Sequence, residues 1–198
     1  MNFLAHAYLS FGNEDVLIGN MISDFVKGKA KENYPASVQK GIILHRDIDV
    51  FTDQHEATKN MKKIFKPAVG LYAGVFTDIV YDFFLANDEV SFKSENELYL
   101  FSQNTYNVLQ RNYKILPEKF QQLLPFMLQQ NWLYHYRTTE GIEKSFKGIF
   151  RRAEYLTYNE VAFNMFLNNL DYLKNCYSVF MPQVHAHTQK RLTELLTE

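Results

Sequence analysis

The stretch GLYAGVFTDIVYDFFLA, residues 70–86, carries apolar side chains around nearly the whole circumference of a helix. A helix with this pattern is normally buried at the centre of its domain. The segments on either side also show helical periodicity, and no series of short alternating segments joined by Asn-Gly or Asp-Gly turns occurs. The stretch therefore predicts an all-α fold built around a central helix over 70–86.

Working outward, prolines and apolar periodicity predict the neighbouring helices. We expect Pro67 to end one helix and Pro125 to kink or divide another, because proline lacks an amide donor and clashes with the preceding turn. No linker rich in proline or glycine is present, so we predict a single-domain helical bundle over residues 1–198. The expected helices cover about 36–53, 56–66, 70–86, 94–112, 139–153, 159–173 and 182–196, and another begins at Pro117.

Composition excludes several classes of protein. With 46% hydrophobic residues and a net charge of −1, the chain is expected to fold rather than to be disordered, and it is not basic enough for a dedicated nucleic-acid binder. Cys176 is the only cysteine, so an intramolecular disulfide is excluded and a reducing compartment is favoured. No secretory signal or membrane span is expected. We predict a cytoplasmic protein with no membrane and no nucleic-acid partner.

The central stretch contains two carboxylates that need a partner. Asp78 and Asp82 are four residues apart and share one helix face, and no basic residue occurs anywhere in the stretch. Two neighbouring carboxylates repel, and one takes up a proton unless a cation lies between them. A bound divalent metal is one solution, and an ion pair with Arg46 or Arg137 is the other.

The helix expected over 36–53 repeats this pattern. Val38, Ile42, His45, Asp49 and Thr52 follow spacings of four, three, four and three, so a histidine and a carboxylate interrupt an apolar face. An ionised carboxylate in a core costs several kcal/mol unless it is paired or bound to a metal. A hydrogen-bonded core histidine and an ion pair with Arg46 are the structural alternatives to a metal site.

Two further candidates lie near the N-terminus. His6 and Asp24 stand in apolar surroundings, and they complete a mixed set of imidazole and carboxylate ligands that suits Mn, Fe, Zn or Mg. A lone histidine in an apolar segment is more often part of the core than a ligand. Because thiolate ligands are absent, a zinc-finger site is excluded. We expect His55, His185 and His187 to lie at the surface.

The basic residues are locally ordered despite the neutral total charge. Lys59, Lys62, Lys63 and Lys66 have spacings that place them on one helix face, which we call the lysine stripe. A solvated face is the simplest interpretation, and steering of an acidic partner or a phosphate group is the functional one. Neither a glycine-rich phosphate loop nor a G-x-S-x-G nucleophile motif is present.

Five motifs together resemble a known family, the acyl carrier protein phosphodiesterases. They are MNFLAH (1–6), GNMISDFVKG (19–28), GIILHRDIDVFTD (41–53), TDIVYDFFL (77–85) and, more weakly, WLYHYR (132–137). The resemblance implies an all-α, HD-domain-like fold, because the family is regarded as distantly related to the HD-domain phosphohydrolases. It also places Asn2, His6, Asp24, His45, Arg46, Asp49, Asp53, Asp78 and Asp82 at positions typical of the family.

The resemblance further implies an activity. The family cleaves the phosphodiester between 4′-phosphopantetheine and a serine of holo acyl carrier protein, and manganese is its usual cofactor. The resulting hypothesis is metal-assisted hydrolysis with His6, Asp24, His45 and Asp78 as metal ligands. Arg46 would bind phosphate oxygens, and Asp49 and Asp82 would orient a ligand or transfer a proton, Asp49 also being a candidate fifth ligand. The lysine stripe would contact the acidic carrier protein.

Two alternatives remain open at this stage. One is an HD-type phosphohydrolase that acts on nucleotides or alarmones, with the same metal site and a different pocket. The other is a helical module that binds acyl carrier protein without catalysis.

Overall fold

The computed structural model describes residues 1–157 and 160–197, and over these ranges it contains helices and turns but no strand, which confirms the all-α prediction. In chain order the elements are α1 (Phe3–Tyr8), α2 (Glu14–Ile22), η1 (Ser23–Phe25), η2 (Gly28–Asn33), α3 (Ala36–Gln54), α4 (Glu56–Val69), η3 (Gly70–Tyr72), α5 (Ala73–Ala86), α6 (Glu95–Arg111), η4 (Tyr113–Ile115), α7 (Glu118–Gln129), α8 (Trp132–His135), α9 (Thr139–Arg152), α10 (Val161–Asn168) and α11 (Leu170–Thr197), where η marks a 3₁₀ helix.

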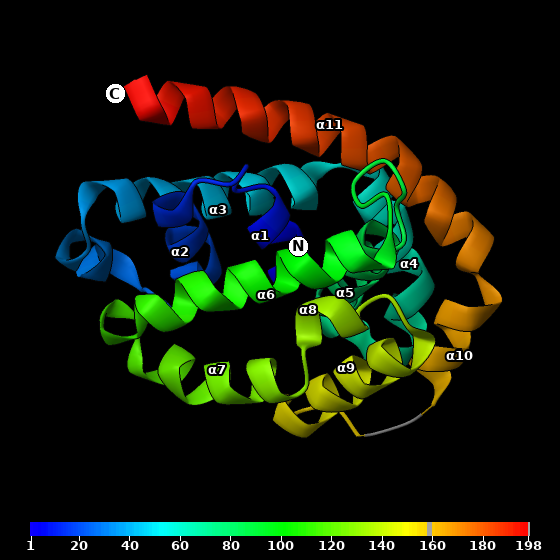
Figure 1. Cartoon of the computed structure of the whole chain (residues 1–198). Helices are drawn as coiled ribbons and strands as arrows, with labels where there is room; N and C mark the ends of the chain where they lie inside the picture. Colours follow the sequence, from blue (N-terminus) through cyan, green and yellow to red (C-terminus); the bar gives the residue numbers. More distant parts are fainter. Residues whose placement is uncertain (158–159, 198) are drawn as a thin grey trace.

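The first five α-helices form the part of the bundle that concerns function. In Figure 1, α3 runs beneath the long α11, and α1 and α2 lie between α3 and the crossing helix α6. Helix α2 packs along α3, and α1 contacts both α2 and α5. The short α1 is therefore held between elements that come later in the chain.

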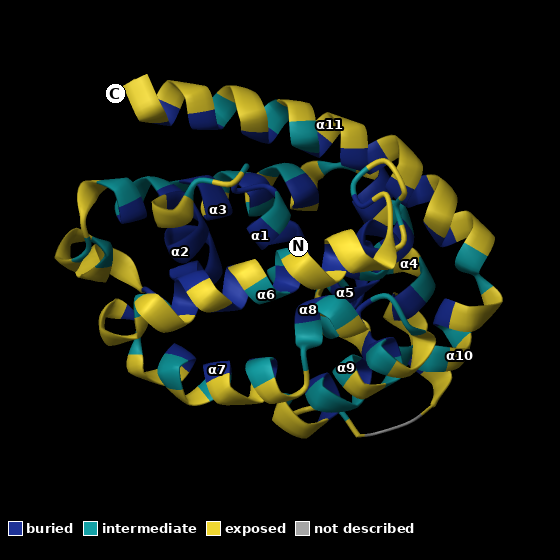
Figure 2. Ribbon diagram, in the orientation of Figure 1, coloured by how far each residue is buried: buried dark blue, intermediate teal, exposed yellow. Residues whose placement is uncertain are grey.

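Aromatic side chains fill much of the interior. The largest fully buried side chains include Tyr81, Tyr106, Phe65, Phe76, Phe120, Phe146, Phe166 and Phe180. Several pack against one another, as in the stacked Tyr81–Phe180 pair and the edge-to-face Phe76–Phe146 pair. Figure 2 shows the buried positions facing inward on each helix, with exposed positions on the outer surfaces. Such pairs add to the stabilisation that comes from burying their large apolar areas.

Helix α5 is the buried central helix that the sequence predicts, except at its start. Phe76, Val80 and Leu85 are fully buried. The predicted first turn is instead the 3₁₀ helix η3, in which Leu71 is 100% exposed, and Val75 in the first turn of α5 is also exposed. The segment Glu56–Ala86 is long and apolar enough to cross a membrane by length and composition alone, but Gly70, with φ of 55°, ends α4 inside it and 56% of its most apolar window is buried in the fold.

Three prolines interrupt the helices less than the sequence predicts. Pro67 lies inside α4, Pro125 inside α7 and Pro182 inside α11. The predicted helices 159–173 and 182–196 are wrong in their division, because the structure has a short α10 followed by one long α11; the predicted start at Asn159 lies outside the described residues. Phe180 and Val184 are buried on either side of Pro182, so packing against the core offsets a local cost of about 3 kcal/mol.

Candidate metal centre

Two glycines let α2 and α3 touch backbone to backbone. A Cβ on Gly41 would lie 2.3 Å from the carbonyl oxygen of Val16, and one on Gly19 would lie 2.1 Å from that of Val38. Real Cβ atoms do not approach oxygen this closely, so only glycine fits at this crossing. The close approach brings Asn20, which follows Gly19, against the side of α3 that carries His45.

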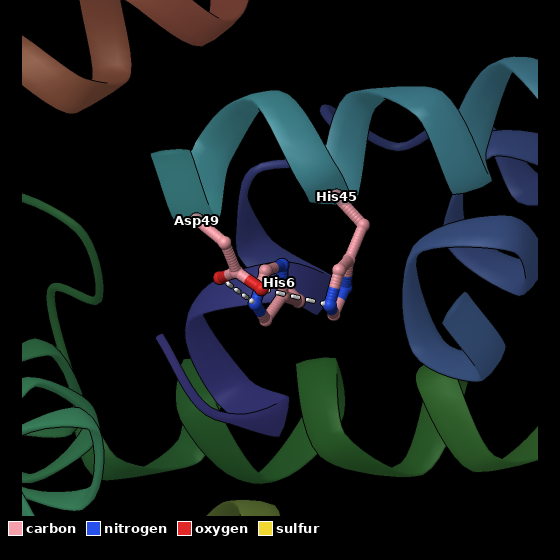
Figure 3. A group of neighbouring side chains, drawn as sticks. All are labelled: His6, His45 and Asp49. Atoms are coloured by element: carbon pink, nitrogen blue, oxygen red, sulfur yellow. Dashed lines mark ion pairs between the residues drawn. The ribbon is translucent and has the colours of Figure 1, made fainter. Parts of the chain in front are cut away.

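Three of the polar residues that interrupt apolar segments meet at one point (Figure 3). His45 and Asp49 extend from α3 one turn apart, and His6 reaches them from α1. The Nε2 atoms of His6 and His45 lie 3.3 Å and 3.1 Å from the two carboxylate oxygens of Asp49. The two imidazole rings stack with centroids 3.8 Å apart. One ligand atom from each residue lies within 4.8 Å of the others.

Asn20 fixes which nitrogen of each histidine carries a proton. Its side-chain nitrogen donates to the carbonyl oxygen of His6 and to Ser10 Oγ, so its Oδ1 is the acceptor that faces His6 Nδ1 at 2.8 Å. Its backbone carbonyl accepts from His45 Nδ1, also at 2.8 Å. Both Nδ1 atoms are therefore protonated donors, and in the neutral rings both Nε2 atoms present a lone pair to Asp49.

Asp24 supplies a second carboxylate on the open side of the group. It lies in η1, its side chain is 71% exposed, and its Oδ1 is 3.2 Å from His45 Nε2. His45 Nε2 thus faces two carboxylates; a proton there offsets part of their negative charge, and a divalent metal ion would offset all of it.

The residues present fit a divalent cation. In the described part of the chain, His6 Nε2 is buried and has no hydrogen bond of acceptable geometry. Each imidazole donates its other N–H to an oxygen of Asn20, which is the arrangement that metal-binding histidines show. Imidazole and carboxylate together suit Mn, Fe, Zn or Mg.

Without a metal, a proton on His45 supplies the positive charge. Burial acts against that proton, but hydrogen bonds to Asp24 and Asp49 outweigh it and raise the pKa of His45 to about 9. Burial and the neighbouring His45 charge lower the pKa of His6 to about 4. Burial would raise the pKa of Asp49, but the N-terminal ammonium and both histidines hold it well below its usual range.

The N-terminal ammonium of Met1 lies between two of the predicted site residues. It is 3.1 Å from Asp49 Oδ1 and 3.4 Å from Asp78 Oδ1. Burial lowers its pKa, but Asp78 and Asp49 more than compensate and raise it to about 11. The structure therefore places Asp78 against Met1 and outside the group formed by His6, His45 and Asp49.

Asp82 holds the start of α1 in place. Its two carboxylate oxygens accept the backbone N–H groups of Leu4 and Ala5 at 2.8 Å and 3.1 Å. Burial raises the pKa of Asp82 to about 7, although these hydrogen bonds act in the opposite direction. These hydrogen bonds do not reach His6, His45 or Asp49 directly. Asp82 therefore acts on the metal centre by positioning the helix that carries His6.

Neither arginine provides the ion pair considered as the alternative partner of Asp78 and Asp82. Arg137 pairs with Glu95. The exposed Arg46 donates from Nη2 to the carbonyl oxygen of Val26, two residues after Asp24, at 3.1 Å.

The lysine stripe lies on the outer face of α4. Lys59 is 3.8 Å from Glu56, Lys63 donates to Asn60, and Lys66 is exposed. Lys62 Nζ is 2.7 Å from Asp53, which follows Asp49 by one turn of α3, so the stripe approaches the metal centre from the α4 side.

Sequence reasoning missed Asn20 and the ammonium of Met1. An amide inside the apolar run VLIGNMI was the available signal for Asn20, since a buried amide needs hydrogen-bond partners. No side-chain pattern signals a backbone amine. Asn2, singled out only by family resemblance, donates to the buried Tyr136 hydroxyl at 3.0 Å and ties the start of the chain to the segment after α8.

A family model and known proteins of similar sequence agree with the family resemblance of the five motifs. The family model described as acyl carrier protein phosphodiesterase matches residues 1–184. A protein of that name from Photorhabdus laumondii is 34% identical over 152 residues, which is 77% of each chain, and one from an Enterobacter species is 28% identical over 191 residues, covering 96% of this chain and 99% of the relative. No solved structure matches. The match over residues 1–184 spans all the residues of the candidate centre, and the chain belongs to the acyl carrier protein phosphodiesterase family.

Proposed function

We propose that this chain is a metal-dependent phosphodiesterase that releases 4′-phosphopantetheine from the serine of holo acyl carrier protein. The observation that carries the proposal is the convergence of the Nε2 atoms of His6 and His45 on the carboxylate of Asp49. Support for the substrate comes from the family and from relatives named acyl carrier protein phosphodiesterase. We place the reaction in the cytoplasm.

His6, His45, Asp49 and Asp24 would hold the divalent cation, for which manganese is our proposal. Such a cation neutralises phosphate charge and makes water a better nucleophile at neutral pH. The exposed Arg46 would bind a non-bridging phosphate oxygen and the negative charge that develops on it. Water attacks phosphorus, the bond from phosphorus to the serine oxygen breaks, and the serine oxygen ends with a proton.

We assign Asp78 and Asp82 roles that differ from the sequence-based hypothesis. That hypothesis made Asp78 a metal ligand and gave Asp82 the task of orienting a ligand or transferring a proton. With its carboxylate against the Met1 ammonium, Asp78 would hold the start of the chain beside Asp49. By accepting two amides of α1, Asp82 would keep His6 in place. The lysine stripe, on the α4 side of the centre, would contact the carrier protein.

The test is mass spectrometry of holo acyl carrier protein after incubation with the purified chain, with a chelator and with added Mn²⁺. We expect the prosthetic group to be lost only when Mn²⁺ is available. We expect His45→Ala and Asp49→Ala each to abolish this loss. His187→Ala, a histidine on α11 away from the centre, is the matched control and keeps full activity. Circular dichroism verifies that each variant is folded.

Three results would contradict the proposal. Full activity in both His45→Ala and Asp49→Ala would remove the centre from the reaction. Binding of holo carrier protein without hydrolysis would favour a non-catalytic module, and hydrolysis of nucleotide phosphoesters in its place would favour the HD-type alternative.

A further inference from the structure

A cleft of about 270 Å³ opens along the segment that follows Asp24. Its walls are mainly apolar and come from Phe25, Val26, Ala30 and Ile115, with the Asn33 amide and the Tyr34 ring among its polar and aromatic lining. It lies between the segment η1–η2, which leads into α3, and the distant η4.

The cleft begins where the candidate centre ends. Phe25 and Val26 directly follow Asp24, whose carboxylate is 3.2 Å from His45 Nε2. The carbonyl oxygen of Val26 accepts a hydrogen bond from Arg46, so the guanidinium that we assign to the phosphate is fixed to the wall of the cleft. A molecule with its phosphate at the centre thus has an apolar cleft that begins at the residue after Asp24.

The lysine stripe lies on the opposite side of the centre. Arg46, Asp49 and Asp53 follow one another along one side of α3, and Asp53 contacts Lys62 of the stripe at 2.7 Å. At about 1.5 Å of rise per residue, the distance from Arg46 to Asp53 along the helix is roughly 10 Å. Figure 1 shows the same order: the chain leading into α3 is at one end of that helix, and α4 is at the other.

We infer that this cleft binds the pantetheine arm of the substrate, an inference that rests on the proposed function. The phosphodiester of the substrate joins an acidic carrier protein to a pantetheine chain. The surfaces on the two sides of the centre differ correspondingly, one being basic and the other mainly apolar. The lysine stripe suits an acidic protein surface. The cleft suits a narrow chain of methyl, methylene and amide groups, because its walls are apolar and Asn33 offers an amide donor and acceptor.

The test uses pantetheine without its phosphate, so that binding does not depend on the metal centre. Its affinity for the intact chain is measured by NMR titration, for the wild type and for Ala30→Trp, which fills the cleft. Glu32→Trp is the matched control, because Glu32 is an exposed residue of the same 3₁₀ helix that does not line the cleft. We expect Ala30→Trp to weaken pantetheine binding about tenfold or more, which corresponds to about 1.4 kcal/mol, while Glu32→Trp binds as the wild type does.

A second measurement separates this inference from the proposed function. Mn²⁺ affinity, measured by calorimetric titration, reports on the metal centre alone, and we expect Ala30→Trp to leave it unchanged while raising KM for holo carrier protein. Pantetheine that binds the wild type and Ala30→Trp equally, or does not bind the wild type, overturns the cleft assignment. Absence of holo carrier protein hydrolysis in the wild type counts against the proposed function, and selective loss of pantetheine binding in Ala30→Trp still supports the cleft.

Discussion

At the scale of single residues, Asn20 determines which ring nitrogen is protonated in two histidines. Asn20 accepts from Nδ1 of His6 with its side chain and from Nδ1 of His45 with its backbone. Its own amide nitrogen is held by the carbonyl oxygen of His6 and by Ser10. Both imidazoles therefore present Nε2 to Asp49 before any metal binds, which reduces the cost of ordering the site.

Asn20→Ala is expected to weaken metal binding more than it weakens the fold. The variant removes the acceptor of the His6 proton and leaves that buried group unpaired, so we expect 10- to 100-fold lower Mn²⁺ affinity and a loss of about 1–3 kcal/mol in unfolding free energy. Calorimetric titration with Mn²⁺ and chemical denaturation measure the two effects. Ser10→Ala is the control, because it removes the Ser10 hydrogen bonds to the Asn20 side chain and to the carbonyl oxygen of His6 but leaves both contacts of Asn20 with the histidine Nδ1 atoms in place. Equal Mn²⁺ affinity in Asn20→Ala and the wild type would contradict this role.

The raised pKa of His45 predicts how stability depends on pH in the metal-free protein. The folded-state pKa is about 9, above the value near 6.5 in an unfolded chain, so the stabilisation is complete below about pH 6.5 and is lost as the pH rises towards 9. We expect the Tm in the presence of a chelator to fall across this range, and His45→Gln to remove that part of the slope. His187→Gln should retain it, and identical slopes in all three proteins would refute the assignment. Added Mn²⁺ should restore the Tm at pH 9, because the cation replaces the proton.

At the scale of secondary-structure elements, the sequence predicted most helices and some of the residues that meet. The bounds expected for α3, α5 and α9 agree with the structure within a few residues, because their apolar periodicity is strong. The pattern also singled out His6, His45 and Asp49, which the structure brings together. It did not find the partners of Asp78 and Asp82, since these are backbone groups of residues 1, 4 and 5 and leave no trace in side-chain spacing. The HD-domain likeness stays a prediction.

The crossing of α2 and α3 is sensitive to the addition of a single methyl group. Gly41→Ala would place a Cβ 2.3 Å from a carbonyl oxygen of α2, so the helices must separate, and we expect a loss of about 1–3 kcal/mol in unfolding free energy. Mn²⁺ affinity should fall as well, because Asn20 moves away from His45. Gly148→Ala in α9 is the control: the nearest atom to its Cβ is the flexible end of Arg151 at 4.0 Å, and helix propensity favours alanine. Chemical denaturation compares the two, and equal stability of both variants would argue against a tight crossing.

At the scale of the whole molecule, the lysine stripe predicts how the carrier protein is captured. Charge reversal at Lys59, Lys62 and Lys63 is expected to lower kcat/KM for holo carrier protein and to weaken its dependence on ionic strength, because steering by opposite charges mainly accelerates association. Steady-state kinetics at several salt concentrations measure both effects. Reversal at Lys144 and Lys147, which pair with Glu140 and Glu143 on α9, provides the control. An unchanged rate and salt response would remove the stripe from the interface.

The ammonium of Met1 predicts that additions at the two ends of the chain have unequal effects. A Gly-Ser extension before Met1 would convert the ammonium between Asp49 and Asp78 into a neutral amide and leave two carboxylates without their cation. Because both carboxylates are partly exposed, we discount the cost of breaking a buried ion pair and expect a loss of about 2–3 kcal/mol, together with reduced activity. The same two residues added after α11 should change neither property. Thermal unfolding and the mass-spectrometric assay provide the comparison, and a fully active, equally stable N-terminal extension would contradict the prediction.

The anchoring of α1 also has a consequence for the order in which the protein folds. Met1 and Asn2, which precede α1, contact Asp49 and Tyr136, and Leu4 at its start contacts Asp82; these partners lie 48, 134 and 78 positions further along the chain. A six-residue helix is not stable alone, so this apolar segment stays unstructured during synthesis until those distant partners have left the ribosome. Residues 1–8 are thus among the last to find their place although they are made early, and a nascent chain that stops before Tyr136 has His6, His45 and Asp49 in its sequence but not all the contacts that hold them together.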